Sequence, residues 1–397
     1  MRINADEWEI YREKVVTRYV VVEDSRVKMI AEKVEYGEAL RVIVDGKVAM
    51  VSGRRLSDEI ADMAVKLART SQDRLSEFPE RSRVERVEVF DPSVMKTTPE
   101  ELKDYGEAIA SVGNISSAHF SVEYIRREIV NSNGVEVAEE ESLAGVVVEA
   151  VFGSGSAYEY HESRRLDFEP ESYAERALEL ARIDDRAEKI DPGRYTVTLS
   201  PVAVDQLLSY ALYPAFYYEN IRRGRSRIGE LMGKEVFGGL SITDDPLLDW
   251  GVNSCSFDDE GVASRRKVLV DGGVVRGYIS DFKHLPESPT GNGFREDYSS
   301  YPSTSPTNVV LDFPERGEAE GVYVHAFIGA HTSNFVSGDF SLELMNASID
   351  GKGIKGAMIY GNVYDLLNRI SHFGNKVRQV GSTVTPEIVL EGVEIKV

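Results

Sequence analysis

The chain has 397 residues, of which 42% are apolar and 28% charged, a composition typical of a folded protein of two or three domains. Its formal net charge of −21 argues against nucleic-acid binding, which requires clustered lysine and arginine. No apolar run is long enough to span a membrane, the polar N-terminus predicts no signal peptide, and a single cysteine excludes a disulfide, so we expect a cytoplasmic protein.

The first quarter of the chain predicts strands followed by one helix. Residues 8–51 are rich in β-branched side chains, and the pair Asp45-Gly46 between two apolar runs predicts a hairpin turn. From Ser57 the pattern predicts an amphipathic helix with that serine as its N-cap. The side chains expected on its core face are Ile60, Met63, Ala64, Leu67 and Ala68.

The middle of the chain repeats this mixture of helices and strands. The expected segments are a linker over 91–100, a helix over 100–112, strands over 118–130 and 144–153 joined by a turn at 131–134, a hairpin turn over 152–157, a helix over 170–183 and a boundary over 184–194. These segments predict a second α+β unit.

The last part of the chain predicts a strand over 194–200 and then a helix with a core-facing stripe of Leu208, Ala211, Leu212 and Ala215. Pro214 lies inside this stripe and should end or kink the helix. After Gly238 short strands alternate with glycine and asparagine turns, which is typical of an antiparallel sandwich or barrel.

The predicted class is therefore α+β, with mixed α/β domains in the N-terminal half and a C-terminal, mostly antiparallel β sandwich or barrel around a core helix. The expected domains are an N-terminal α+β domain over 1–90, a central α+β domain over 91–192 and a β-rich domain over 193–397.

The common catalytic and nucleotide-binding motifs are absent from the sequence. No two histidines have the H-E-x-x-H spacing of a zinc site. His325 and His331 would share the face of one strand, but Gly329 should interrupt that strand. Cys255 has no histidine near it in sequence, and we interpret it as a buried thiol rather than a nucleophile.

Two acidic clusters have two possible roles. Asp244 and Asp245 lie in one cluster, and Asp258 and Glu260 lie in the other, about fifteen residues further along. Carboxylates in such turns can bind a hard cation or can accept backbone N–H bonds, and we favour the second role. Asp339 is similarly expected to cap a turn that enters a strand.

An arginine cluster follows the core helix. Arg222, Arg223, Arg225 and Arg227 surround Gly224. Such a cluster can bind a carboxylate or phosphate through bidentate hydrogen bonds, but on an acidic protein we favour a solvated turn that balances local charge.

Several motifs in a fixed order resemble the TldD/PmbA family across almost the whole chain. They are Arg-Arg-Gly-x-Ser at 222–226, "FDDEGV" at 257–262, "TGNGFRE" at 290–296, "SPTNVV" at 305–310, "GAHTSNFVSGDFSL" at 329–342 and "GNVYDLL" at 361–367. The resemblance implies one of two kinds of subunit, only one of which has a zinc site.

In the TldD type, an H-E-x-x-x-H zinc motif precedes the Arg-Arg-Gly-x-Ser stretch, and a cysteine ligand follows further along. That motif would fall on Ser209, Tyr210 and Pro214 here, which cannot replace its histidines and glutamate, and Cys255 is not at the position of the cysteine ligand. The chain therefore resembles the PmbA (TldE) type, which lacks the metal site. We expect no catalytic residue, metal or cofactor in this chain, and zinc in a TldD-type partner.

The resemblance further implies a heterodimer with a TldD-type protease that processes unfolded or small peptides in the cytoplasm. The expected substrate-cavity residues are Arg222, Arg223, Thr290, Asn292, Arg295 and Asn308; the 290–295 loop and Asn308 fit tight-turn chemistry equally well. Two alternatives remain, a stand-alone hydrolase with a divergent metal site built from Asp244, Asp245, Asp258, Glu260, His325 or His331, and a peptide-binding homodimer without enzymatic activity.

Overall fold

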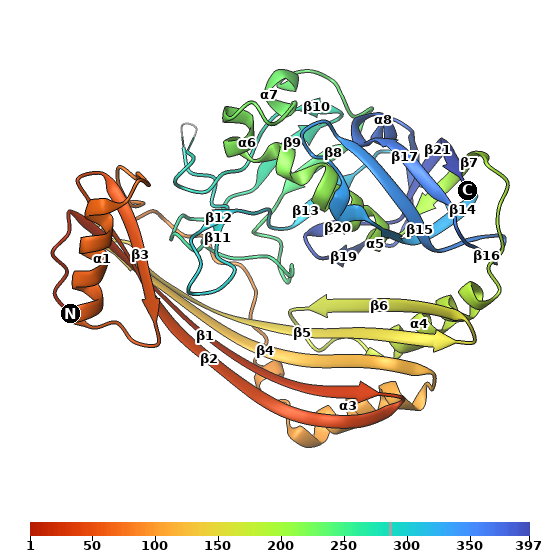
Figure 1. Cartoon of the computed structure of the whole chain (residues 1–397), viewed down its shortest axis with the longest axis horizontal. Coiled ribbons are helices and arrows are strands. Elements are labelled where there is room, and N and C mark those ends of the chain that lie inside the picture. Colours follow the sequence, from red (N-terminus) through yellow and green to blue (C-terminus); the bar gives the residue numbers. More distant parts are fainter. Residues whose placement is uncertain (286–287) are drawn as a thin grey trace.

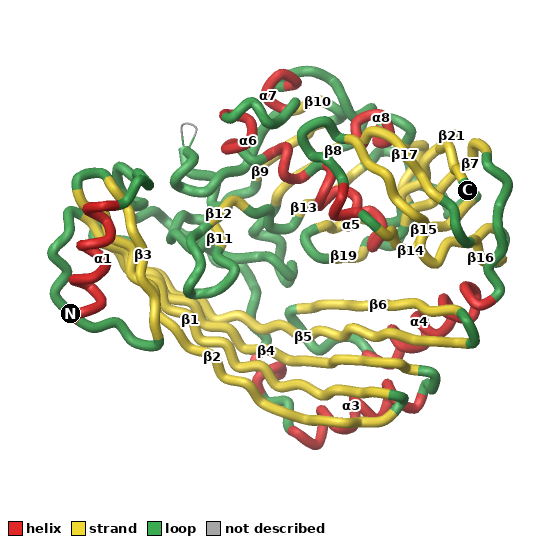
Figure 2. The backbone as a smooth tube through the Cα atoms, viewed as in Figure 1, coloured by secondary structure: helices red, strands yellow, loops and turns green. Residues whose placement is uncertain are grey.

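The computed structural model describes residues 1–285 and 288–397, and a large curved sheet dominates its first half (Figure 1, Figure 2). The strands of this first sheet are β1 Glu7–Glu23, β2 Arg26–Val44, β3 Lys47–Gly53, β4 Ile115–Asn131, β5 Glu136–Phe152 and β6 Gly155–Ser163. All neighbours are antiparallel, in the order β3-β2-β1-β4-β5-β6. The sheet curves into a half-barrel, with one inner and one outer face (Figure 1).

Local turn chemistry sets the hairpins of this sheet, as the sequence predicts. Asp45 and Gly46 both have positive φ, 50° and 71°, which is the geometry of a tight two-residue hairpin turn. Asn131 closes the next predicted turn, because its side-chain oxygen accepts bonds from the backbone N–H groups of Asn133 and Val135.

Helices cover the outer face of the sheet at both ends. The helices of this half are α1 Asp58–Thr70, α2 Pro92–Met95, α3 Pro99–Ser111 and α4 Pro170–Asp185. The predicted start of α3 is confirmed by a capping box, in which Thr98 and Glu101 satisfy each other's backbone N–H groups. Together α3 and α4 bury the apolar outer side chains of β1, β4, β5 and β6.

Helix α1 begins at its predicted cap and buries the predicted core residues Ala64 and Ala68, but part of its predicted core face is exposed. Its buried residues are Ala61, Ala64, Val65 and Ala68. The predicted core residues Met63 and Leu67 are 50% and 45% exposed, so this part of the prediction is wrong. A face of mostly alanine lets α1 lie close against β2 and β3, which the apolar spacing alone does not reveal.

The C-terminal half contains a closed barrel and a second sheet. The barrel strands are β7 Gly193–Leu199, β14 Val322–Ile328, β15 Asp339–Ile349, β17 Met358–Asn362 and β21 Ile388–Lys396, with β16 Lys352–Ile354 and β18 Ile370–Phe373 attached. The β14–β15 pairing closes the order β14-β7-β21-β17-β15 into a ring. The predicted α+β class with a C-terminal β barrel is confirmed.

The second sheet has the order β10-β9-β8-β13-β20-β19. Its strands are β8 Ser241–Asp244, β9 Lys267–Asp271, β10 Val274–Val275, β13 Val309–Asp312, β19 Arg378–Val380 and β20 Thr383–Thr385, and a separate pair is formed by β11 Gly293–Phe294 and β12 Ser303–Thr304. The remaining helices are α5 Pro201–Ala211, α6 Tyr218–Arg222, α7 Ile228–Leu231 and α8 Val363–Leu367, with 3-10 turns at Tyr213–Phe216 and Ala330–Thr332.

Helix α5 is the predicted core helix. It packs between the barrel strands β7 and β14 and the strands β19 and β20 of the second sheet. Ser200 caps it by accepting from the N–H groups of Val202 and Ala203. The helix ends at Ala211, before Pro214, which lies in the following 3-10 turn. Proline has no backbone N–H group to continue the hydrogen bonds of the helix.

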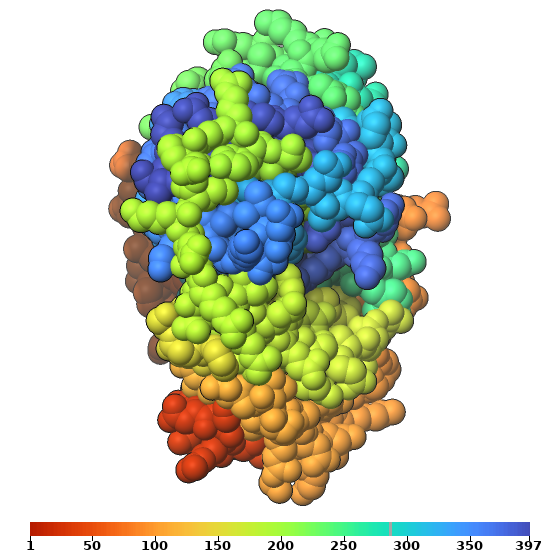
Figure 3. Space-filling model, turned by 90° about the vertical axis from the view of Figure 1, so that its right-hand side faces the viewer, coloured from red at the N-terminus to blue at the C-terminus, as the bar shows by residue number. Residues whose placement is uncertain are grey.

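The C-terminal half lies over the inner face of the first sheet (Figure 1). From the side, the space-filling view shows the two halves in contact, with the end of the first half packed against the barrel (Figure 3). The expected boundary near residue 90 falls between β3 and β4, which share one sheet, and the three-domain division stays a prediction. No helix among the described residues is long and apolar enough to cross a membrane.

Gly155 marks the closest approach of β6 to α4. A Cβ atom there would overlap the carbonyl oxygen of Ala181 and the backbone of Asp184 and Asp185. Since backbone atoms cannot move cheaply, we expect Gly155→Ala to destabilise the fold by about 1–3 kcal/mol in urea unfolding. Gly145→Ala on β5 is the matched control, because its Cβ would meet no atom within 3.7 Å; equal losses for both would contradict the packing argument.

Candidate functional site

A cavity of about 360 Å³ lies between the inner face of the first sheet and the C-terminal half. From the sheet it is lined by Glu13, Ile125, Arg127, Glu141, Leu143, Glu162 and, just past the end of β6, Arg164; from the C-terminal half it is lined by 252–255, Asp259, 294–295, 305–306 and Ser382. The cavity is therefore built from both halves of the chain, and most of its side chains are polar or charged.

A buried ionic cluster forms one wall of the cavity. The Arg127 guanidinium pairs with the Glu141 carboxylate and, at 2.8 Å, with Asp259. Arg164 donates to Glu141 at 2.8 Å and to the Ser254 carbonyl at 3.0 Å. Burial acts to raise the pKa of Glu141, but the two arginines outweigh it and the net pKa is lowered, so this carboxylate is ionised at neutral pH.

A second buried cluster lies next to the first and also joins the two halves. Arg41 on β2 pairs with Glu9 at 2.6 Å and with Glu260 at 3.0 Å. Arg295 pairs with Glu9 at 3.0 Å, and its guanidinium lies 4.7 Å from the centre of the Tyr11 ring. Each charge has a partner, which is the condition for burying ions without a large loss of stability.

Two carboxyl groups lining the cavity differ from these fixed ions. Burial raises the pKa of Glu13, against a hydrogen bond that it accepts from the Tyr11 hydroxyl at 3.0 Å. Burial also raises the pKa of Glu162. These two groups can take up a proton more readily than exposed glutamates, and so the cavity can adjust its charge to a ligand.

Helix α5 carries the positions where the family's zinc motif would fall. Ser209 donates to the Asp205 carboxylate at 3.3 Å, Tyr210 is 47% exposed, and Pro214 lies beyond the helix end. A serine, a tyrosine and a proline do not fit a zinc ion. No group of three or more His, Cys, Asp or Glu side chains within the described parts of the chain is placed to hold a metal.

Asp205 is the unusual group on this helix. Its carboxylate accepts from the Thr383 hydroxyl at 2.7 Å, and the Tyr213 hydroxyl lies 2.6 Å from that threonine oxygen. Burial raises the pKa of Asp205 to about 6, although hydrogen bonds from Thr383 and Ser209 act against the shift. Thr383 follows Ser382, so this cluster adjoins the cavity.

The predicted cavity residues fall in different environments. Arg295 lines the cavity. Thr290 is buried and bonds to both backbone groups of Ser280. Asn292 is buried and donates to Asp244 at 3.0 Å.

Asn308 is fully buried as well, where it donates to the Asp245 carbonyl and the Ser254 hydroxyl. It accepts from the backbone of Asn253 and the side chain of Gln379. Asn308 therefore positions the 253–254 wall of the cavity without lining it.

The arginines after α5 lie away from the cavity. Arg222 and Arg223 are exposed, and Arg223 pairs with Glu219 at 2.7 Å. Neither residue lines the cavity between the two halves. Their surroundings are those of a solvated helix end.

The acidic clusters hold turns and ion pairs together. Asp244 pairs with Lys267 at 2.7 Å, and Asp245 accepts from the Leu247 backbone. Asp258 accepts from the N–H groups of Glu260, Val262 and Gly293.

Asp339, expected as a turn cap, and His325 and His331, proposed for a divergent metal site, form no metal-binding group with these clusters among the described residues. Asp339 accepts from Ser337 and Asn362 on the surface. His325 is buried near Glu159, and His331 is exposed beyond the strand break at Gly329, which has a φ of 89°. Cys255 is buried as predicted, and burial raises the pKa of its thiol to about 12, so it is not a thiolate at neutral pH.

Arg127, Glu141, Arg164 and Asp205 are site residues that no sequence motif marks. Their sequence neighbours gave little signal, since Arg127 lies between Arg126 and Glu128, and Glu141 lies between Glu140 and Ser142. Arg127 pairs with Glu141, which is 14 positions further along, and with Asp259 of the C-terminal half, which is 132 positions further along, and no local pattern identifies these partners.

The chain belongs to the PmbA/TldD metallopeptidase family. Residues 8–71, 79–184 and 192–397 match, in that order, domain 1, the central domain and the C-terminal domain of the PmbA/TldA metallopeptidases. The resemblance drawn from the sequence motifs is thereby confirmed.

Individual relatives agree with this assignment. An uncharacterized protein of Methanocaldococcus jannaschii is 31% identical over 90% of this chain and 89% of its own length. The metalloprotease TldD homolog of Buchnera aphidicola subsp. Schizaphis graminum is 26% identical over 54% of this chain, which is 47% of that relative. The crystal structure of TldE from Thermococcus kodakarensis has the same fold, with a TM-score of 0.90 and 24% identity over 98% of this chain and 97% of that one.

The raised pKa of Asp205 makes a prediction about stability and pH. The pKa of Asp205 is higher in the folded than in the unfolded state. The folded state therefore loses stability as the pH rises from about 4 to about 6. Asp205→Asn keeps an acceptor for Thr383 but cannot ionise. The variant should therefore raise the free energy of unfolding relative to the wild type, and this increase should be about 1 kcal/mol larger at pH 8 than at pH 5. The exposed Asp62→Asn is the control, and a pH-independent effect of Asp205→Asn would refute the assignment.

The adjacent residues Arg126 and Arg127 provide a matched test of the buried ions. Arg127→Leu removes a shared partner of Glu141 and Asp259 and should cost about 3 kcal/mol of unfolding free energy. Arg126 pairs with Glu128 and Glu140 on the surface, and Arg126→Leu should cost less than about 1 kcal/mol. Equal losses in urea unfolding would show that the buried cluster does not join the halves.

Proposed function

We propose that this chain is the PmbA (TldE)-type subunit of a TldD/TldE-type zinc metalloprotease complex that processes unfolded or small peptides in the cytoplasm. In this proposal the chain holds no metal, a TldD-type partner supplies the zinc and the catalytic residues, and this subunit completes the chamber that holds the peptide.

The observation that carries the proposal is that the positions of the family's zinc motif, at the end of α5 and just beyond it, have no zinc-binding side chains. The family's motif would place two histidines and a glutamate where this chain has Ser209, Tyr210 and Pro214. Membership of the PmbA/TldD family and the same fold as a TldE support the choice of subunit type. The carboxylates expected for a divergent metal site support it too, since each is already bound to other groups.

In this proposal the cavity between the two halves contributes to the peptide chamber. Arg295 is held at its edge by Glu9 and by the Ser300 carbonyl at 2.8 Å. Glu162, which forms no ion pair among the described residues, and Glu13 give the cavity an acidic side that suits amine or guanidinium groups of a peptide. Binding energy would come from several weak polar contacts, which suits a protease with little sequence preference.

Metal content of the purified chain, alone and co-expressed with a TldD-type partner, tests the proposal. We expect no stoichiometric zinc in the isolated chain, one zinc per heterodimer in the complex, and peptide cleavage by the complex that the isolated chain lacks. The partner purified alone is the control for zinc that does not depend on this subunit. Stoichiometric metal in the isolated chain, or no complex with the partner, would overturn the proposal.

A further inference from the structure

Strand β5 has an open edge in the middle of the molecule. Over its whole length it pairs with β4, from Glu136 to Ala150. On its other side it pairs with β6 only from Ala144 onward. The stretch 136–143 therefore has a strand partner on one side alone.

The direction of the free backbone groups follows from two hydrogen bonds. Asn131 on β4 donates to the Val135 carbonyl, so odd-numbered residues of β5 direct their backbone groups to β4. Ser142 donates in the opposite direction, to the Val89 carbonyl at 3.0 Å. The backbone N–H and C=O groups of Ala138 and Glu140 therefore point away from β4, and no hydrogen bond to them on that side is found among the residues described.

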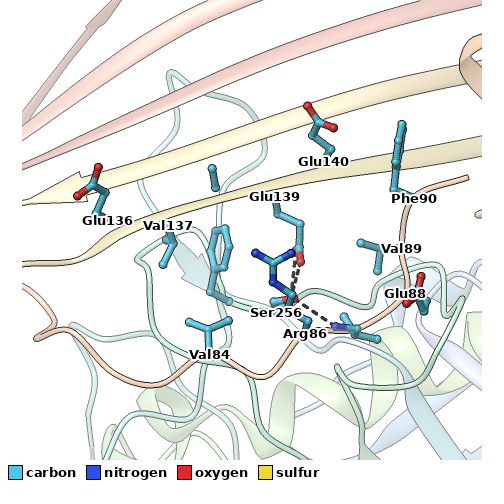
Figure 4. A pocket seen from close by; sticks show the side chains of 13 residues that line it. Val84, Arg86, Glu88, Val89, Phe90, Glu136, Val137, Glu139, Glu140 and Ser256 are labelled. Carbon is cyan, nitrogen blue, oxygen red and sulfur yellow. Dashed lines mark hydrogen bonds between the residues drawn. The ribbon is translucent and has the colours of Figure 1, made fainter. Parts of the chain in front are cut away.

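An extended segment faces this edge across a cavity of about 500 Å³ (Figure 4). The segment 84–90 meets β5 at the Val89–Ser142 hydrogen bond and separates from it over 136–140. It is held from the far side, because Trp250 donates to the Glu88 carbonyl at 2.8 Å. We call the space between 84–88 and 136–140 the β5 slot.

The floor of the β5 slot is fixed by the C-terminal half. Ser256 donates its backbone N–H to the Glu139 carboxylate at 3.1 Å, and its hydroxyl accepts from the Val87 backbone at 3.4 Å (Figure 4). Phe257 also lines the slot. The two walls are thus held apart by the interface between the halves, which keeps the edge of β5 available.

The charge of the slot selects its ligand. Glu88, Glu136, Glu139 and Glu140 line it together with Arg86. Two of these carboxylates already have partners, since Glu139 accepts from the Ser256 N–H and Glu140 pairs with Arg126 at 3.2 Å, so Glu88 and Glu136 carry the charge argument. Open backbone donors and acceptors along a strand edge bind another extended backbone, and the alternating side chains of that backbone would meet these carboxylates. An acidic slot of this form is complementary to an extended peptide with lysine or arginine side chains.

We propose that the β5 slot binds an extended, basic peptide segment by strand addition to the 136–140 edge of β5. The choice of a peptide as ligand rests on the proposed function, but the slot is separate from the cavity between the halves and needs no partner subunit. Its test therefore uses the isolated chain, and its failure would leave the proposed function untouched.

The experiment measures fluorescence anisotropy of a fluorescein-labelled peptide, Gly-Thr-Lys-Val-Lys-Thr amide, titrated with the full chain at low salt. Ala138→Pro removes a backbone donor that β4 does not use, and proline is tolerated at strand edges. We expect Ala138→Pro to weaken binding about tenfold, and Ala138→Thr, which keeps the N–H group at the same exposed position, to bind as the wild type does.

A second arm uses the wild-type chain, so it holds even if the proline variant fails to fold. The same peptide with alternate backbone nitrogens methylated keeps its charge but loses the donors for one strand edge, and we expect it to bind about tenfold more weakly. Glu88→Gln with Glu136→Gln should weaken binding of the unmodified peptide and reduce its salt dependence.

Three results would overturn the proposal. The first is no binding of the unmodified peptide by the wild type. The second is equal binding of the methylated and unmodified peptides, which would mean charge attraction without strand addition. The third is concentration-dependent self-association of the wild type that Ala138→Pro abolishes, which would make a second copy of this chain the occupant of the slot.

Discussion

The buried ion pairs between the inner face of the first sheet and the C-terminal half are the constraint on which the rest of the structure depends. Arg41, Arg127 and Arg295 each pair across or along this interface with Glu9, Glu141, Asp259 or Glu260. Ions removed from water are tolerated only in fixed geometry with every charge paired. The interface therefore fixes one orientation of the two halves. The apolar contacts around Phe257 are less directional than ion pairs and alone would allow more orientations.

Both the cavity and the β5 slot follow from this interface. Arg164, directly after β6, turns into the interior to bind Glu141 and the 251–254 backbone. Strand β6 therefore ends at Ser163 and leaves part of β5 unpaired. On the inner side the same arginine, with Arg127, forms the wall of the cavity. A single change of chain direction thus creates a polar cavity on one side and an open strand edge on the other.

The site residues inferred from motifs and those found in space differ in a consistent way. Thr290, Asn292 and Asn308 belong to glycine-rich, polar motifs, and the structure places them in buried hydrogen bonds that hold the 253–254 wall and the second sheet. Of the six residues predicted to line the substrate cavity, only Arg295 lines the cavity between the two halves. A motif marks residues that a fold needs, but it does not separate those that touch a ligand from those that position its neighbours.

The sequence by itself determined the features that depend on neighbours in the chain. The Asp45-Gly46 hairpin, the Thr98–Glu101 capping box and the end of α5 before Pro214 are local, because turn and cap bonds and the missing proline donor act within a few residues. Only the tertiary structure decided the rest. Groups far away in sequence determine which face of α1 is buried, how β14 and β15 close the barrel, and that Asp259 pairs with Arg127. A local sequence pattern cannot predict which distant charge or strand a residue will contact.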